Sequence, residues 1–262
     1  MTIPIYQVDA FTAQVFGGNP AAVCPLDTWL SAETMQSIAA ENNLAETAFI
    51  VESESGYDLR WFTPTVEVDL CGHATLAAGY VVLNYLRPEL DSVAFETMSG
   101  TLTVTRDGDQ LSMDFPSRVP QATAISKSLS DALGKAPLEV HMSRDILAVY
   151  DDEASIRALS PDQAKLAAIK DGFGIIVTAK GDDVDFVSRF FVPKAGIPED
   201  PVTGSTHCTL VPFWSERLGR TRLLAQQLSA RGGELQCEHR GERVKISGHC
   251  VLFLTGTISL CG

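Results

Sequence analysis

Three side chains spread along the chain have the chemistry needed to move a proton. They are Glu46 in "NLAETAF", His73 in "EVDLCGHAT" and Asp200 in "EDPVTGSTH". A glutamate, an imidazole and an aspartate prefer different protonation states, so together they supply both an acid and a base in one water-poor site. The residues around Glu46 are apolar, and we expect burial to raise the pKa of Glu46 toward the range useful for proton transfer.

Each of the three residues also has an ordinary structural interpretation. Glu46 fits the solvated edge of an alternating strand, and His73 fits a hydrogen-bonded packing position. Asp200 fits a capping residue ahead of a helix. The chemical interpretation therefore depends on the elements that bring these side chains together.

Two glycines, Gly72 and Gly204, mark equivalent helix starts, and His73 and Ser205 follow them directly. The first turn of a helix has unpaired N–H groups and a partial positive charge, and glycine lets a ligand approach the backbone closely. We expect the two helix starts to hold a carboxylate and to stabilise the enolate-like charge that forms when a neighbouring C–H loses its proton. The alternative is two well-capped helices without a ligand.

The chain contains an internal repeat. "LSAETMQSIAA" from Leu30 returns as "LSPDQAKLAAI" from Leu159, and both segments indicate a serine-capped helix with an acid in its first turn. "RWFTP" returns as "RFFVP" 129 residues later, at 60 and 189, and "EVDLCGHAT" aligns with "EDPVTGSTH". "GTLTVTRDGDQLSMDF" and "GELQCEHRGERVKISG" are both typical of hairpins.

Four matches in the same order predict two similar α+β lobes, residues 1–117 and 118–262. Ligand sites favour the crevice between such lobes. The last segment, "VLFLTGTISLCG", is expected to return and pair with the first lobe.

Composition limits the classes of partner. The 262 residues carry a formal net charge of −13, which would repel nucleic acid and anionic lipid. No targeting or membrane-spanning stretch is evident, so we expect a cytoplasmic protein. Six cysteines spread over this length indicate reduced thiols, and their spacing with histidine does not predict a metal site.

The chain resembles the PhzF-like proteins of the phenazine biosynthesis isomerase type, which are related in fold to diaminopimelate epimerase. The resemblance lies in "QVDAFTAQVFGGNPAAV", "NLAETAF", "RWFTPTVEVDLCGHATLA", "MDFP" and "EDPVTGSTH". It implies an α+β fold of two pseudo-symmetric lobes, each a curved, mainly antiparallel sheet around a central helix. It also implies a homodimer without a metal or an organic cofactor.

The resemblance assigns roles to residues of this chain. It makes Glu46 the base that takes and returns a proton, with His73 and Asp200 as its catalytic partners. It implies that the substrate-binding positions are Asn19, Gly72, Gly204 and Ser205. The expected activity is a cofactor-independent isomerisation of a small substrate that carries a carboxylate.

Two alternatives remain. Related racemases and epimerases exchange a proton between two cysteines, one at each helix start. Here Cys71 matches the first position but Thr203 matches the second, and a threonine hydroxyl does not replace a thiol in that exchange. Cys208 lies further along the second helix and leaves this racemase alternative open. The other alternative is a non-catalytic protein that binds a metabolite in the same cleft.

Overall fold

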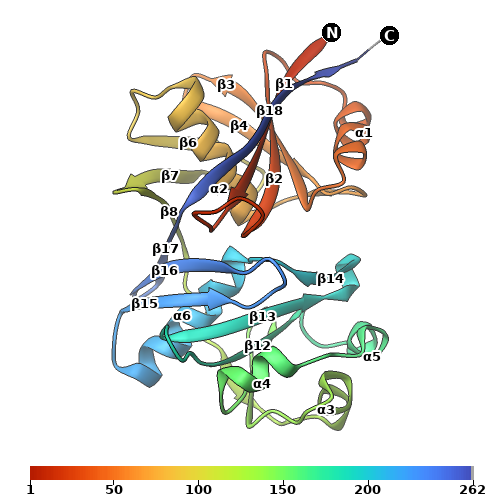
Figure 1. The fold of residues 1–262 in the computed structure, drawn as a ribbon, viewed down its shortest axis with the longest axis vertical. Coiled ribbons are helices and arrows are strands. Elements are labelled where there is room, and N and C mark those ends of the chain that lie inside the picture. The colour runs from red at the N-terminus through yellow and green to blue at the C-terminus, as the bar shows by residue number, and fades with distance from the viewer. Residues whose placement is uncertain (261–262) are drawn as a thin grey trace. The chain divides into compact units, whose positions relative to one another are not determined.

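The computed structural model describes residues 1–260, which form two compact units. The first unit is Met1–Asp114 together with the chain from Ser247 onward, and the second is Phe115–Ile246. The sequence placed the division at residues 117 and 118 and assigned the last segment to the second lobe. The expected pairing of the last segment with the first lobe is confirmed, because β18 (Cys250–Ser259) pairs antiparallel with β1 (Thr2–Ala10) and runs alongside it (Figure 1). This pairing places β18 in the first unit. Cys261 lies outside the described residues.

The first unit is built from strands with two intervening helices. After β1 its elements are β2 (Asn19–Leu26), α1 (Ala32–Asn42), β3 (Glu46–Ser53), β4 (Gly56–Phe62), β5 (Glu67–Val68), α2 (Gly72–Val81), β6 (Ser92–Glu96), β7 (Leu102–Asp107) and β8 (Gln110–Pro116). A π-helical turn, Val82–Leu86, continues α2. The strand β8 leads into the second unit.

In the second unit, strands again alternate with helices. Its elements are β9 (Gln121–Thr123), α3 (Lys127–Leu133), β10 (Glu139–Met142), β11 (Ile146–Val149), α4 (Glu153–Ala158), α5 (Gln163–Ala168), β12 (Ile175–Lys180), β13 (Phe186–Val192), a 3₁₀ turn (Pro193–Ala195), β14 (Ile197–Asp200), α6 (Gly204–Leu218), β15 (Arg222–Gln227), β16 (Gly233–Arg240) and β17 (Arg243–Gly248). None of the described helices has the length and apolar character needed to cross a membrane.

Both units have the same strand topology. In the first, β2 and β3 are parallel, β3 and β4 antiparallel, and β4 and β6 parallel. In the second, β11 and β12 are parallel, β12 and β13 antiparallel, and β13 and β15 parallel. The connection between the last parallel pair contains α2 in one unit and α6 in the other. The repeat in the sequence is therefore a repeat in the fold, which is α+β with mixed, mainly antiparallel pairing.

The helices α2 and α6 belong to the cores of their units. Leu76, Ala77 and Val81 of α2 are fully buried, as are Leu210 and Val211 of α6. The helix α2 is apolar on nearly all faces and so needs neighbours on nearly all faces, whereas α6 carries the exposed Glu216 and Arg217 in its last turn. The strands β1, β2, β3 and β7 contact α2, and β15 and β16 contact α6. This burial fixes where each helix begins.

Gly79 allows α2 to lie very close to β7. A Cβ atom built on Gly79 would meet Val104 Cγ1 at 2.5 Å, well inside van der Waals contact. Glycine removes that clash at the cost of a lower helix propensity. The close contact helps to fix the distance between α2 and β7, and with it the position of His73 on α2.

The caps of the repeated helices agree only in part with the sequence prediction. Ser31 caps α1 by accepting a hydrogen bond from the Thr34 N–H at 3.1 Å. The predicted serine cap of the second copy is wrong, because Asp162 caps α5 through the Lys165 N–H. The helix therefore starts at Gln163, two residues later than expected.

Candidate active site

A half-buried acid and a buried imidazole meet in the first unit. Glu46 is the first residue of β3, and His73 is the second residue of α2. Glu46 Oε2 lies 3.0 Å from His73 Nε2, and the two side chains are only 12% and 5% exposed. The two atoms are not aligned as a hydrogen bond, and neither has another hydrogen-bond partner among the described residues. Glu46 Oε2 therefore remains available to accept a proton from a ligand.

The other ring nitrogen of His73 is held from the opposite side. The Asn19 amide group donates to His73 Nδ1 at 3.2 Å, and Cys71 Sγ lies 3.5 Å from the same nitrogen. In this orientation of Asn19, Nδ1 accepts, so the proton of a neutral ring is on Nε2 and faces Glu46. A second ring proton would require the Asn19 amide to turn and present its oxygen.

The surroundings of this cluster favour the charged imidazole and the neutral thiol. Burial alone opposes a charge on His73, but Cys71 and the Glu46 carboxylate more than offset it and raise the pKa of His73 well above its ordinary value. We attribute the net direction to Glu46, since it carries the full negative charge. Burial, with Glu46 second, raises the pKa of the Cys71 thiol to about 11. Cys71 is thus protonated at neutral pH.

Glu46, Cys71 and His73 also have the types of metal ligands, and their ligand atoms lie within 4.8 Å of one another. In this arrangement Cys71 faces Nδ1 of the ring while Glu46 faces Nε2. One ion binds a single ring nitrogen and lies on that side of the imidazole. The observed arrangement fits proton transfer through the ring better than a site with all three ligands.

In the second unit, the turn between β14 and α6 carries Asp200. The Thr203 hydroxyl donates a hydrogen bond to Asp200 Oδ2. Gln227, at the end of β15, accepts from the Thr203 N–H at 2.9 Å and donates to the Asp200 carbonyl at 2.8 Å. Asp200 is therefore part of a turn that side-chain hydrogen bonds hold in one conformation.

His207, one turn into α6, strengthens the same turn. Its Nδ1–H donates to the Thr203 carbonyl at 2.8 Å, and the ring is completely buried. Burial lowers the pKa of His207 to about 4, although the bond to Thr203 opposes this. The ring is neutral, so His207 has a positioning role and does not exchange protons at neutral pH.

The two central helices differ from the other described α-helices in their caps. Side chains of Ser31, Ser126, Asp152 and Asp162 cap α1, α3, α4 and α5. The N-cap residues of α2 and α6, Cys71 and Thr203, make no side-chain capping bond. The helix ends with Gly72 and Gly204 in their first turns therefore lack the N-cap bond that would otherwise occupy a first-turn N–H.

A repeated ion pair precedes each of these helix starts. Arg60 of β4 binds both carboxylate oxygens of Glu67 at 2.7 and 2.8 Å. Arg189 of β13 binds Glu199 in the same way at 2.7 and 2.9 Å. Bidentate pairs of this kind restrict geometry strongly. Each pair ties the short strand before the helix to a central strand of its unit.

The structure thus groups the predicted site residues by unit. It brings Asn19, Glu46 and His73 together, with Gly72 beside them at the start of α2. It places Asp200 beside Thr203, with Gly204 and the half-buried Ser205 at the start of α6. Joint action of the two groups on one ligand stays a prediction.

Sequence reasoning missed Gln227 and the two ion pairs. The arginines and glutamates stand at matching positions of the repeated segments, so the repeat contained this information. Gln227 sits in the apolar run "LLAQQL", where no pattern distinguishes it from Gln226.

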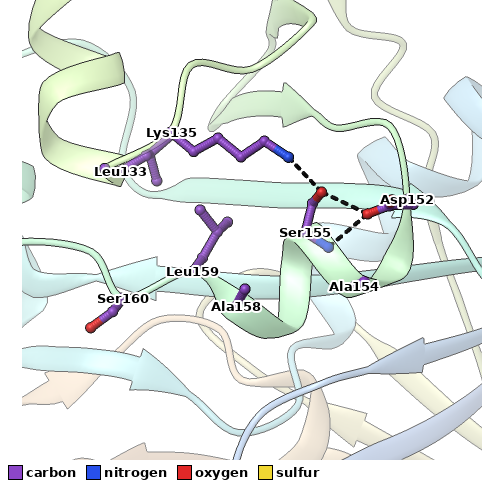
Figure 2. A pocket seen from close by; sticks show the side chains of 9 residues that line it. Leu133, Lys135, Asp152, Ala154, Ser155, Ala158, Leu159 and Ser160 are labelled. Atoms are coloured by element: carbon purple, nitrogen blue, oxygen red, sulfur yellow. Dashed lines mark hydrogen bonds between the residues drawn. The ribbon is translucent and has the colours of Figure 1, made fainter.

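A separate cavity of about 490 Å³ lies in the second unit, lined by Leu133, Gly134, Lys135, Asp152, Ala154, Ser155, Ala158, Leu159 and Ser160 (Figure 2). Figure 2 shows Lys135 pointing at Ser155, with Nζ and Oγ 2.6 Å apart, and Ser155 bonded to Asp152. Asp152 is also the cap of α4. These polar groups are hydrogen-bonded to one another, and the capping of α4 accounts for the network.

Comparison with known proteins gives the family. The family model for phenazine biosynthesis-like proteins matches residues 8–256. An uncharacterized isomerase of Pseudomonas aeruginosa is 53% identical, over 99% of this chain and 100% of its own length. The crystal structure of a PhzF-family phenazine biosynthesis protein from Enterococcus faecalis is 48% identical, with a TM-score of 0.98 over 99% of this chain and all of that one.

More distant structures share only the fold. A hydroxyproline epimerase from Agrobacterium vitis superposes with a TM-score of 0.62 at 10% identity, covering 98% of this chain and 91% of that one. The α+β architecture is therefore common to PhzF proteins and epimerases of this type. On the full-length matches and the names of its close relatives, this chain belongs to the PhzF family of phenazine biosynthesis-like proteins and is an isomerase.

Proposed function

We propose that the protein is a cofactor-independent isomerase that moves a proton on a small, carboxylate-bearing substrate, cyclic or amino-acid-like, with Glu46 as the base. The observation that carries the proposal is Glu46 Oε2, a carboxylate oxygen buried against His73 without an aligned hydrogen-bond partner among the described residues. A carboxylate oxygen that makes no hydrogen bond within the protein can accept a proton from a ligand held against it.

His73 and Asp200 assist this step. The proton on His73 Nε2 faces Glu46, so the imidazole can stabilise the carboxylate and donate to a developing negative charge. Asp200 accepts a hydrogen bond from Thr203, which favours its ionised form. Two carboxylates with such different partners fit the different roles of proton carrier and assistant.

The carboxylate of the substrate is held by backbone N–H groups at Gly72 and at Gly204 and Ser205, with Asn19 as a further binding residue. The lack of N-cap side-chain bonds at α2 and α6 supports this part of the proposal. Glycine in the first turn leaves room for an anion to approach the helix end.

The cysteine-dependent racemase is the second candidate. Its first position is Cys71, whose thiol pKa is raised to about 11, and its second is Thr203. Cys208, the remaining candidate, is buried, and burial raises its pKa to about 11 as well. A thiol that stays protonated is a poor base, which favours Glu46. A non-catalytic binding protein is disfavoured by the isomerase names of the close relatives.

The test is solvent-deuterium exchange. The wild-type protein is incubated in heavy water with pooled small carboxylic acids and amino acids, and the labelled compound is found by mass spectrometry. Glu46→Gln should reduce labelling by a factor of at least about 10² while the compound still binds, since general-base catalysis is worth about that much. Cys71→Ser should leave labelling within about threefold of wild type. If Glu46→Gln labels the compound as well as the wild type does, or if Cys71→Ser no longer labels it, the result would favour the racemase.

We also propose that the protein works in the cytoplasm as a homodimer. The five cysteines of the described residues are all free thiols, which fits a reducing compartment. The homodimer follows from the family resemblance. Light scattering after size exclusion should give twice the mass of one chain, and a single-chain mass would contradict the assembly.

A further inference from the structure

Gln227 makes more bonds to the Asp200–Thr203 turn than packing alone requires. It is completely buried at the end of β15. Its Oε1 accepts from the Thr203 N–H at 2.9 Å, and its Nε2 donates to the Asp200 carbonyl at 2.8 Å and to Thr203 Oγ1 at 3.3 Å. One side chain therefore binds both ends of the turn.

These hydrogen bonds determine where the hydroxyl proton of Thr203 points. The Thr203 N–H can only donate, so the Gln227 oxygen faces it and the Gln227 NH₂ group faces the other two partners. Thr203 Oγ1 accepts one of these NH₂ protons, which turns its own single hydroxyl proton elsewhere. That proton goes to Asp200 Oδ2. Gln227 thus makes Thr203 a donor to the carboxylate.

We propose that Gln227 is a positioning residue of the isomerase, which orients the Thr203 hydroxyl so that it donates to Asp200 and keeps that carboxylate ionised and fixed. The inference rests on the proposed function through the role given to Asp200. A hydrogen bond from a neutral donor to a carboxylate stabilises the ionised form, and its loss shifts the equilibrium toward the protonated acid.

The first test measures Asp200 directly and needs no substrate. Aspartate side chains are labelled with ¹³C, the Asp200 signal is assigned with Asp200→Asn, and its titration is followed by NMR. Gln227→Met and Thr203→Val, which both keep the net charge, should each move the Asp200 midpoint upward by about one pH unit, the tenfold change expected for a lost bond to a charged group. Gln226→Met, a neighbour on the same strand, is the matched control and should not move it.

The double variant separates positioning from packing. If Gln227 acts through the Thr203 hydroxyl, Gln227→Met adds little once that hydroxyl is gone, and the double variant shifts the midpoint no further than Thr203→Val. Additive shifts, or no shift in Gln227→Met, would overturn the proposal. Should Gln227→Met fail to fold, Gln227→Asn replaces it, since the shorter amide cannot reach both partners.

The second test uses the compound that the wild-type protein labels in heavy water. Gln227→Met should lower kcat for exchange about tenfold at neutral pH, with KM within about twofold, because the Asp200 carboxylate is no longer held in position. The acidic limb of the pH profile should move upward with the Asp200 midpoint. Thr203→Ser, which keeps the hydroxyl, should retain most of the activity. An unmoved acidic limb in Gln227→Met would overturn the positioning role. Failure of Glu46→Gln to reduce exchange would instead refute the proposed function and leave the Asp200 titration unaffected.

Discussion

The buried, neutral His207 predicts how the stability of the second unit depends on pH. In the unfolded chain this histidine takes up a proton near its ordinary pKa of 6.5, whereas in the folded chain the pKa is about 4. The contribution of the neutral ring is therefore fully present above pH 6.5 and is lost as the pH falls toward 4. At about 1.4 kcal/mol per tenfold change, the complete loss is about 3 kcal/mol, of which about 1 to 2 kcal/mol falls between pH 7.5 and 5.5.

The assay is urea denaturation at several pH values between 7.5 and 5.5, followed by circular dichroism, for the wild type and His207→Gln. The variant cannot titrate, so the wild type should lose about 1 to 2 kcal/mol more than the variant on acidification. Thr206→Val is the control, since it removes the other side-chain bond to the Thr203 carbonyl without removing a titrating group. Equal pH dependence in wild type and His207→Gln would refute the assignment of a buried neutral ring.

Three further predictions concern the elements around the candidate site. His73 has a raised pKa, so its contribution to stability is fully present below pH 6.5 and is lost as the pH rises through the folded value. The stability difference between wild type and His73→Gln should therefore shrink from pH 6 to pH 9, and a constant difference in the same urea assay would contradict it. Gly79→Ala should destabilise by about 1 to 3 kcal/mol through its clash with Val104, measured by calorimetry, and adding Val104→Ala should recover part of the loss; simple additivity would argue against the contact. Arg189→Met should cost about 2 kcal/mol because it leaves Glu199 without its bidentate partner, and Arg189→Met with Glu199→Leu should cost less than the single change in thermal melts.

The sequence was informative where the chain repeats. The aligned segments predicted two α+β lobes, and both units have the same order of parallel and antiparallel strands around α2 and α6. Repetition works because each copy solves the same packing problem, so matching apolar positions return at matching places. The boundaries differ in two ways: β18 belongs to the first unit through its expected pairing with β1, and the first boundary lies at Asp114 and not at residue 117.

The sequence was less informative about how polar groups are satisfied. It pointed to Glu46 and His73 by residue type, but their 3.0 Å contact joins β3 to α2 and depends on tertiary packing. The cap of α5 was placed at Ser160, since serine is a common cap, whereas the structure has Asp162 as the cap, and serine and aspartate are about equally good caps. Gln227 escaped notice because its role comes from a bond across 24 residues that no local pattern encodes.

The proton transfer by Glu46 is tested most directly by a crystal structure of Glu46→Gln with the compound that the wild-type protein labels in heavy water. The account predicts the amide of residue 46 within about 3.5 Å of the carbon that gains deuterium, and the substrate carboxylate within hydrogen-bond distance of the backbone N–H groups near Gly72 or Gly204. A labelled carbon placed closer to Cys71 or Cys208 than to residue 46, or a residue 46 that makes no contact with the compound, would contradict it.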